Sequence, residues 1–371
     1  MRFTFLLLLL FVSVFSFAQS FYMFVGTYTN KGSKGIYVYK FDASTGKAEW
    51  LSNTDSIVNP SYLGIAPDKN HIYAVTETAT NNTGSISSFS FNRSTGKLSF
   101  INKQSSGGAN PCYVAVNNTN KWVVTGNYTG GNLSALPLNA DGSLQPLSQL
   151  IQHTGAGVNK ERQEKAHVHC TVFSPDQKYL FTPDLGEDKV YVYNFNAASQ
   201  KPLTPATPPF AASEPGSGPR HLTFHPNNKF AYLIEELSGT VVVYKYNSGK
   251  LNRVQRITTH PSDFKGVIGS ADIHVSPDGK FLYASNRGEE NTITIFSIDQ
   301  NTGKLTLKGY QSTMGQTPRN FNIDPSGNYL LVANQATDNI VIFKRDKQTG
   351  LLHETSEQIK VPTPVCIQMM K

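Results

Sequence analysis

The stretch "HLTFHPNNKFAYLIEE", His221–Glu236, contains two apolar arms on either side of a polar turn at Pro226. Proline, asparagine and lysine in the middle, with aromatic and aliphatic residues outside, indicate a β-hairpin. The same turn pattern recurs along the chain, at Pro67, Pro175, Pro277 and Pro325, with "VNNTNK" around Asn118 in the equivalent place. From Pro175 onward the intervals between turn prolines are 51, 51 and 48 residues. The chain is therefore built from a repeated unit.

Each unit has the composition of four strands. A short strand ("CTVF", "HLTF", "DIHV") precedes the turn, and a second strand ("YLFT", "FAYLI", "FLYAS") follows it. A polar loop, an alternating third strand ("VYVYNF", "VVVYKY", "TITIFSI"), a "TGKL"-like turn and a fourth strand complete the unit. No amphipathic helix fits between the strands, so the repeat is typical of a propeller blade.

The unit at the N-terminus is split. It has three strands, and "TPVCIQM", Thr363–Met369, at the other end of the chain can supply the missing innermost strand. Such closure removes free sheet edges. With the six complete units, we expect an all-β fold: a seven-bladed β-propeller with four antiparallel strands per blade, closed by the C-terminal strand joining the N-terminal blade.

Met1–Ala18 has the layout of a secretory signal: Arg2, an apolar run, and small residues before Gln19. We expect residues 1–18 to be a signal peptide and residues 19–371 to form the propeller. The protein would then be exported to the periplasm or the extracellular space. The apolar run is too short for a durable membrane span, so no stable membrane insertion is expected.

Composition excludes several classes of protein. Three cysteines do not make a disulfide framework, and we interpret them as buried apolar residues. The net charge is +7, but no lysine–arginine run indicates nucleic-acid binding. No glycine-rich phosphate loop is present, and we expect no cofactor. The pattern carries no signal for an oligomeric state.

Aligning the units at the turn proline identifies two ranks of residues at one end of the predicted channel. The first strand of a blade begins, and the second strand ends, on the face opposite the proline turn. Six residues before the turn, the blades have Val365, Ser61, Cys112, His169, Arg220, Ala271 and Arg319. Ten residues after it, they have Tyr28, Glu77, Tyr128, Leu185, Glu236, Arg287 and Gln335. We call these fourteen positions the mouth ring.

Ionisable residues gather on one side of the mouth ring. Arg220 and Glu236 come from one blade, His169 from the blade before it, and Arg287 from the blade after it. Guanidinium groups offer bidentate donors to carboxylate or phosphate, and a histidine–glutamate pair can perform acid–base catalysis. The pattern predicts a site for a small anion. In the alternative, structural interpretation, Arg220 and Glu236 form a salt bridge that holds one hairpin together.

Other chemical interpretations are weaker. His167 and His169 have the spacing of metal ligands, and His274 or Glu236 could complete a set, but the nearby arginines would repel a cation. We therefore predict no metal and expect His167 to support His169. His221 should point away from Arg220, because side chains alternate along a strand.

At this point the sequence resembles a known family, the seven-bladed propeller lactonases, which include bacterial propeller-type 6-phosphogluconolactonases and, more distantly, fungal carboxymuconate-lactonizing enzymes. The resemblance covers essentially the whole chain after the leader. It rests on "GTYT" (Gly26–Thr29), "NPSYL" (Asn59–Leu63), "GNYTGGNLS" (Gly126–Ser134), "HVHCTVFSPD" (His167–Asp176), "GPRHLTFHP" (Gly218–Pro226), "EELSGTVVVY" (Glu235–Tyr244), "ADIHVSPDGKFLYASNRG" (Ala271–Gly288), "PRNFNIDPSGNYLLVANQ" (Pro318–Gln335) and "KQTGLL" (Lys347–Leu352).

The resemblance implies hydrolysis of a sugar lactone to the aldonate, without a metal. The family's proposed histidine, two arginines and glutamate match His169, Arg220, Arg287 and Glu236. Many members have asparagine where this chain has Glu235, whose side chain we expect to point away from Glu236. Further substrate contacts are expected from Arg319 and Gln335, which would hold a phosphate or carboxylate tail, and from Glu77, Tyr28, Tyr128 and His167.

Two alternatives to hydrolysis stay open from the sequence. One is the reverse type of chemistry, in which an unsaturated dicarboxylate of the muconate type is cyclised to a lactone at the same anion site. The other is a non-catalytic binding propeller at the cell envelope, because a fold does not by itself imply an activity.

Overall fold

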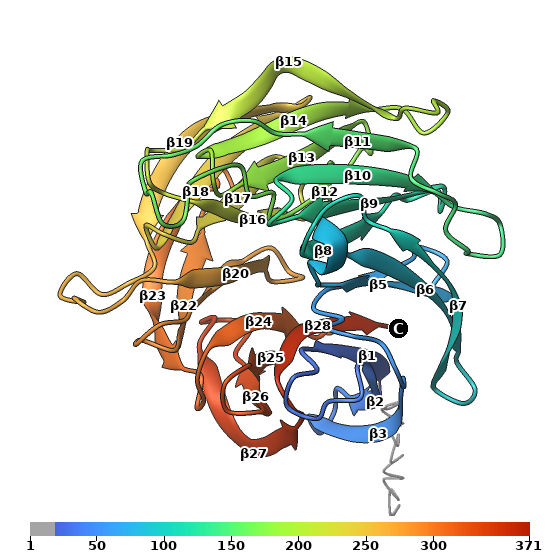
Figure 1. The fold of residues 1–371 in the computed structure, drawn as a ribbon. Coiled ribbons are helices and arrows are strands. Elements are labelled where there is room, and N and C mark those ends of the chain that lie inside the picture. Colours follow the sequence, from blue (N-terminus) through green and yellow to red (C-terminus); the bar gives the residue numbers. More distant parts are fainter. Residues whose placement is uncertain (1–18) are drawn as a thin grey trace, which may run out of the picture.

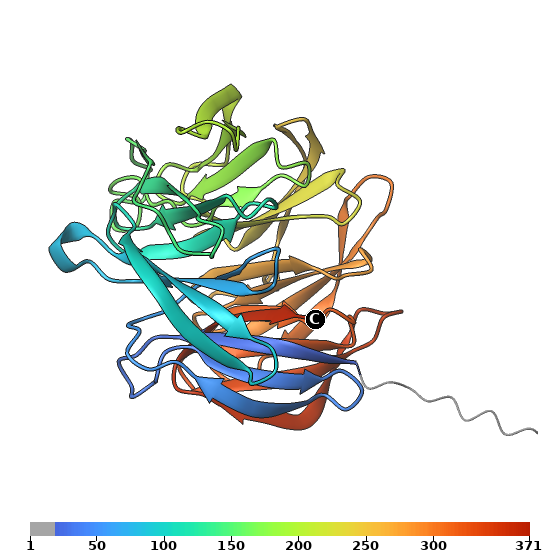
Figure 2. The ribbon, with the colours of Figure 1, turned by 90° about the vertical axis from the view of Figure 1, so that its right-hand side faces the viewer.

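A computed structural model describes residues 19–371, and the expected leader Met1–Ala18 lies outside them. Seven four-stranded antiparallel sheets are arranged in a ring, which confirms the predicted seven-bladed propeller (Figure 1). Seen from the side, the connecting loops lie on the two faces of the ring (Figure 2). Within residues 19–371 one short 3-10 helix, η1 (Thr80–Asn82), occurs, and none of their helices is long and apolar enough to cross a membrane.

Each blade runs from an innermost strand at the channel to an outer strand at the rim. In this order the first three blades are β28 (Pro364–Met370), β1 (Ser20–Thr27), β2 (Tyr37–Asp42) and β3 (Lys47–Asn53); β4 (Leu63–Ile65), β5 (His71–Thr76), β6 (Ser85–Asn92) and β7 (Lys97–Ser105); and β8 (Pro111–Val116), β9 (Trp122–Asn127), β10 (Asn132–Pro137) and β11 (Gln149–Gln152).

The other four blades follow the same order. They are β12 (Val172–Phe173), β13 (Tyr179–Asp184), β14 (Lys189–Phe195) and β15 (Leu203–Ala212); β16 (Pro219–Phe224), β17 (Phe230–Glu235), β18 (Thr240–Asn247) and β19 (Lys250–Thr258); β20 (Ser270–Val275), β21 (Phe281–Asn286), β22 (Thr292–Ile298) and β23 (Leu305–Ser312); and β24 (Pro318–Ile323), β25 (Tyr329–Asn334), β26 (Asn339–Arg345) and β27 (Leu352–Lys360).

The two ends of the described chain close the ring. Strand β28 pairs antiparallel with β1, with Phe24 opposite Gln368 and Val25 opposite Ile367. The C-terminal strand thus becomes the innermost strand of the N-terminal blade, as the split unit predicted.

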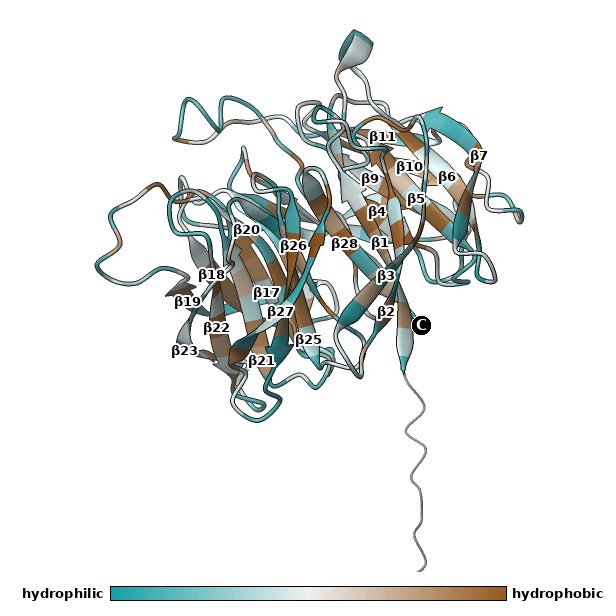
Figure 3. Cartoon of the chain, turned by 90° about the horizontal axis from the view of Figure 1, so that it is seen from below, coloured by the Kyte–Doolittle hydropathy of each residue, from teal (hydrophilic) through white to brown (hydrophobic). Residues whose placement is uncertain are grey.

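Apolar side chains pack between neighbouring blades. Inner and middle strands such as β17 and β25 are mostly hydrophobic, whereas outer strands such as β7 carry long hydrophilic stretches (Figure 3). A repeated hydrogen bond ties adjacent blades together. The hydroxyl of Tyr232 donates to Gly303 O at 3.0 Å, and Tyr73 and Tyr283 make the equivalent bonds to Gly142 and Gly350. These bonds join three pairs of adjacent blades, and apolar packing joins the blades throughout the ring.

β-Bulges occur where the innermost strands begin. In five blades the pairing register between innermost and second strand shifts by one residue at this end. The residue left out of the pairing is Arg220 in β16 and Arg319 in β24. A bulge bends the strand and re-aims its side chains. This local irregularity turns the first rank of the mouth ring into the channel.

Candidate active site

The mouth ring has the same backbone geometry in all seven blades. Each second-rank residue donates its backbone N–H to the carbonyl found two positions before the first-rank residue, at 2.7 to 3.1 Å. The donor–acceptor pairs are Tyr28–Thr363, Glu77–Asn59, Tyr128–Asn110, Leu185–His167, Glu236–Gly218, Arg287–Gly269 and Gln335–Thr317. The two ranks counted along the sequence therefore meet around one end of the channel.

Glu236 lies at the centre of the charged cluster. Its Oε2 accepts from Arg220 Nε at 2.8 Å and lies 3.1 Å from a terminal nitrogen of Arg287. Its Oε1 accepts from a terminal nitrogen of Arg162 at 2.6 Å. The Glu236 side chain is only 6% exposed. Three guanidinium groups thus share one buried carboxylate.

Burial and charge act on Glu236 in opposite directions. Burial alone would raise the pKa of this carboxyl, but the guanidiniums of Arg287, Arg220 and Arg162 together hold the pKa well below its usual range. Glu236 is ionised at neutral pH. Burial, with the nearby charges of Arg220 and Arg319, lowers the pKa of Arg287 to about 10 even though Glu236 favours its charged form.

His169 lies beside this cluster. Its Nε2 is 4.0 Å from Glu236 Oε2, and its Nδ1 is 3.8 Å from Cys112 Sγ. Burial and the charge of Arg220 keep the pKa of His169 well below its ordinary value, so the imidazole is neutral at neutral pH. The unprotonated nitrogen of a neutral imidazole can accept a proton from water, and the Glu236 carboxylate is near enough to stabilise the imidazolium that results. Burial raises the pKa of the Cys112 thiol, which argues against a thiolate nucleophile there.

A network of hydrogen bonds fixes the position of the Arg220 side chain. It donates to Ala271 O at 2.7 Å and lies 3.1 Å from His221 Nε2, while His221 Nδ1 is 2.8 Å from Asp272 Oδ1. The expectation that His221 points away from Arg220 is wrong. The bulge at Arg220 interrupts the alternation of side chains, and both residues face the channel.

A second cluster occupies the opposite side of the mouth. The Tyr28 hydroxyl donates to the Glu77 carboxylate at 3.0 Å, and Arg319 lies 4.0 Å from Glu77 and over the Tyr28 ring. Gln335 directly follows β25, and its backbone N–H donates to Thr317 O, as the ring register predicts. Among the contacts described for residues 19–371, none joins its side chain to Arg319.

Aromatic stacking supports the histidine side of the mouth. His167 stacks on the Tyr128 ring with centroids 4.4 Å apart, and its Nδ1 donates to Tyr128 O at 3.0 Å. The Tyr128 ring meets His169 edge-on at 5.3 Å. His167 thus contacts His169 through the Tyr128 ring, and its supporting role stays a prediction.

Below the mouth lies a small cavity of about 10 Å³. Its lining includes Ser61, Tyr62, Cys112, His169, Arg220, His221, Arg319, Asn320 and Val365. The volume is about the minimum that one water molecule needs. The buried hydroxyl of Ser61 has no hydrogen-bond partner within the described residues, so the cavity offers a free polar group as well as His169.

Sequence reasoning missed Arg162. The residue lies in the segment between β11 and β12, outside the repeated hairpins, so no register position pointed to it. One signal was available: this segment is the longest connection between two blades, and long structured loops are frequently functional.

Glu235 behaves as expected for the neighbour of Glu236. Its carboxylate lies 3.0 Å from Arg256 and accepts from Ser238, on the side of the strand away from Glu236. The three cysteines are buried and free, as predicted.

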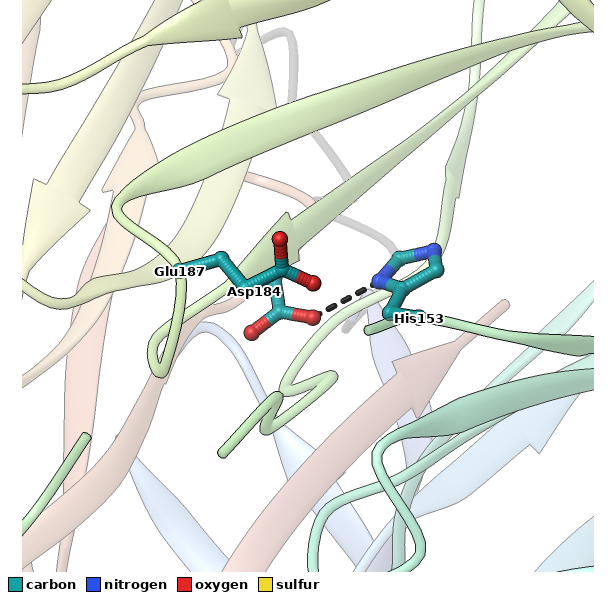
Figure 4. Close-up of side chains that lie close together, drawn as sticks. All are labelled: His153, Asp184 and Glu187. Carbon is teal, nitrogen blue, oxygen red and sulfur yellow. Dashed lines mark hydrogen bonds and ion pairs between the residues drawn. The ribbon is translucent and has the colours of Figure 1, made fainter. Parts of the chain in front are cut away.

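One group could hold a metal by geometry alone. Donor atoms of His153, Asp184 and Glu187 lie within 4.8 Å of one another (Figure 4). Most of their hydrogen bonds are already made: His153 lies 2.7 Å from Asp184 and 2.8 Å from the Tyr193 hydroxyl, and Glu187 Oε2 pairs with Lys189. The buried Glu187 Oε1 has no hydrogen-bond partner within the described residues. Asp184 also accepts the backbone N–H of His167 at 2.7 Å. We interpret this group as a support for the segment that carries His167 and His169.

Comparison with known proteins agrees with the seven-bladed fold. Residues 22–369 match the family described as Lactonase, 7-bladed beta-propeller. The chain is 40% identical to a 6-phosphogluconolactonase of Formosa agariphila, over 94% of this chain and 99% of the relative, and 36% identical to that of Bacillus subtilis, over 94% and 97%. The structure of a periplasmic gluconolactonase of Pseudomonas aeruginosa superposes with a TM-score of 0.91 at 36% identity, covering 95% of this chain and 99% of the other. The chain belongs to the seven-bladed propeller lactonase family.

Proposed function

We propose that this protein hydrolyses a sugar lactone to the aldonate at the mouth ring, as a metal-independent 6-phosphogluconolactonase-like enzyme. The observation that carries the proposal is the neutral, buried His169 beside the carboxylate of Glu236, which lies among arginines. This arrangement provides a proton acceptor, a counter-charge for the protonated acceptor, and cationic donors for a developing oxyanion.

The acid–base roles follow from the protonation states. Glu236 is ionised and bonded to three guanidiniums, so it is a poor proton acceptor. His169 is neutral and lines the cavity that has room for one water. We assign the general base to His169. Glu236 lies 4.0 Å away and stabilises the imidazolium that forms.

The reaction then proceeds in two steps, attack by water and collapse of the tetrahedral oxyanion. The oxygen of water attacks the lactone carbonyl carbon while its proton passes to His169, which produces a tetrahedral oxyanion. Arg287 and Arg220 lie where they can stabilise this negative charge. Collapse of the oxyanion breaks the bond between the carbonyl carbon and the ring oxygen, and the imidazolium returns its proton to that oxygen. The new carboxyl group loses a proton to solvent, and His169 is neutral again.

The cluster on the opposite side of the mouth would bind the rest of the sugar. Glu77 partly neutralises Arg319, so this side combines hydrogen-bond donors and acceptors with an aromatic face at Tyr28. Such a mixture suits hydroxyl groups, whereas the sequence alone led us to expect a phosphate or carboxylate tail at Arg319 and Gln335. Gln335, Tyr128 and His167 complete the wall around the substrate.

The names of the relatives favour hydrolysis over the two alternatives. A lactonizing enzyme would use the same arginines on a dicarboxylate, and a binding propeller would need neither His169 nor the carboxylate beside it. Comparing the turnover of a δ-lactone with that of a muconate distinguishes hydrolysis from lactonization. Lactone hydrolysis by itself excludes a non-catalytic binding role.

The direct test is lactone hydrolysis by purified Gln19–Lys371. Initial rates with 6-phosphoglucono-δ-lactone and glucono-δ-lactone are measured in EDTA, with spontaneous ring opening subtracted. We expect an enzymatic rate that falls to background in His169→Gln and by at least about a hundredfold in Glu236→Gln. Glu235→Gln is the matched control, because it removes the adjacent buried carboxylate, which pairs with Arg256 instead. No rate on either lactone, or full activity in His169→Gln, would refute the proposal.

We also propose that residues 1–18 direct export and are removed after Ala18. The similar gluconolactonase from Pseudomonas aeruginosa, described as periplasmic, supports a location outside the cytoplasm. Mass spectrometry of protein from the periplasm or medium should find Gln19 at the N-terminus. An intact Met1 in cytoplasmic protein would contradict export.

A further inference from the structure

Arg162 differs from the other arginines of the mouth in its exposure. Its side chain is 44% exposed, against 1% for Arg220 and 16% for Arg287. It reaches inward from the rim, where it donates to Glu236 Oε1 at 2.6 Å and to the Tyr128 hydroxyl at 3.3 Å. Arg162 is therefore the most accessible of the three guanidiniums that contact Glu236.

The backbone beneath Arg162 is firmly anchored. Gln163, which is fully buried, donates from its amide to Leu185 O and to Asp188 Oδ1, both at 2.8 Å. The same Asp188 carboxylate accepts the backbone N–H groups of Gly216 and Gly218, at 2.7 and 2.9 Å. The segment that carries Arg162 is thus tied to the segment that leads into Arg220. The main chain stays in place while the long arginine side chain can change partner.

The charges around Glu236 do not balance. Three guanidiniums meet a single carboxylate there, which leaves two positive charges without a counter-ion in the cluster. Arg319 on the other side of the mouth has Glu77 as its partner. The excess positive charge is therefore concentrated beside Glu236, and its accessible member is Arg162. An anionic group on the substrate would be drawn to this side.

We propose that Arg162 selects lactones that carry an anionic group, such as a phosphate ester, by exchanging Glu236 Oε1 for that group when the substrate binds. This inference rests on the function proposed above and names a residue that would set the substrate specificity of the same site. Once Arg162 has turned to the substrate, Glu236 keeps only Arg220 and Arg287. The carboxylate then stabilises the imidazolium of His169 more strongly. The anionic group thus contributes both to binding and to the chemical step.

A neutral lactone has no group that can replace the carboxylate as the partner of Arg162. It should bind more weakly, and Arg162 should stay on Glu236 during its turnover. Loss of the Arg162 charge should accordingly lower kcat/KM for the phosphorylated substrate but not for the neutral one. A charge-assisted hydrogen bond of this kind corresponds to about ten- to a hundredfold in kcat/KM.

The test compares 6-phosphoglucono-δ-lactone and glucono-δ-lactone in the wild type, Arg162→Gln, Arg162→Lys and Lys160→Gln. Lys160 is the matched control: it lies two residues away, is exposed, and its Nζ donates to Gly157 O at 3.4 Å. We expect Arg162→Gln to lower kcat/KM for the phosphorylated lactone at least about tenfold. The kcat for the neutral lactone should instead rise, because Glu236 then keeps only Arg220 and Arg287 and stabilises the His169 imidazolium more strongly. Arg162→Lys should recover part of the loss, and Lys160→Gln should match the wild type.

Inhibition by inorganic phosphate provides a second, independent test of an anion contact with Arg162. It should inhibit hydrolysis of the neutral lactone competitively, and its inhibition constant should rise about tenfold in Arg162→Gln. An unchanged ratio of the two substrates in Arg162→Gln, an equal loss on both, or an unchanged inhibition constant would overturn the role of Arg162. A wild type that is inactive on both lactones would instead refute the proposed function, so the two failures are distinguishable.

Discussion

The excess of guanidinium groups over carboxylates in the Glu236 cluster leads to a specific prediction about the stability of two variants. Replacing Glu236 by glutamine removes the one carboxylate that three guanidiniums share, whereas replacing Arg287 by methionine leaves that carboxylate with two partners. The two substitutions delete charges from the same buried group. They should nevertheless lower the free energy of unfolding by very different amounts.

The magnitudes follow from burial. Breaking a buried ion pair so that charge is left uncompensated costs about 3–5 kcal/mol. Glu236→Gln leaves Arg220, with a side chain 1% exposed, and Arg287, 16% exposed, without their counter-ion, so it should fall in this range. Arg287→Met relieves repulsion between cations and mainly loses a hydrogen bond of 3.0 Å to Gly269 O. Its cost should be about 1–3 kcal/mol.

Urea unfolding at pH 7 measures both values. Trp122 is a suitable fluorescent probe because it is buried and its indole N–H donates to Ala197 O in the next blade. Inorganic phosphate should stabilise Glu236→Gln more than the wild type, since an anion that binds only the folded state can replace the missing carboxylate. A destabilisation by Arg287→Met equal to that by Glu236→Gln would refute the reasoning, and so would equal stabilisation of both proteins by phosphate.

Two further predictions concern the histidine side of the mouth. Because burial and Arg220 hold the pKa of His169 well below 6.5, the unprotonated base persists in mild acid, and kcat/KM corrected for spontaneous hydrolysis should stay constant as pH falls from 7 through 6.5; a decline centred near 6.5 would contradict the assignment of His169. A Cβ at Gly186 would clash with Lys165 O, so Gly186→Ala should displace the segment before His167 and destabilise the protein by about 1–3 kcal/mol in urea unfolding. The control is Gly269→Ala, which should be nearly neutral because no neighbour would lie closer than 3.8 Å to the new Cβ. Equal effects of the two substitutions would contradict this steric argument.

The propeller and its mouth ring could be predicted from the sequence because their signals are local and repeated. Each turn proline marks a hairpin, and counting from it places Arg220 and Glu236 at the same end of the channel as His169 and Arg287. The hydrogen bond between Glu236 N and Gly218 O recurs in every blade, so one register holds for all seven. Repetition substitutes for the long-range information that a single sequence lacks.

The features that sequence reasoning missed lie where the repetition fails. Arg162 belongs to an irregular segment with no counterpart in the other blades. The direction of His221 depends on a bulge, and one extra residue reverses which face the following side chains occupy. The bulge at Arg220 places both Arg220 and His221 in the channel, where His221 links Arg220 to Asp272. Strand alternation alone predicted the opposite.

The composition of the cluster argues for a ligand rather than for a purely structural role. A buried ion pair contributes little to stability compared with well-packed apolar residues of similar volume. If the cluster only held the Arg220–Glu236 hairpin together, one arginine would be enough. The structure adds Arg287 and Arg162 to the same carboxylate and leaves excess positive charge at an accessible rim. We infer that this excess destabilises the free protein and would be offset by a bound anion, as the proposed selection of an anionic substrate requires.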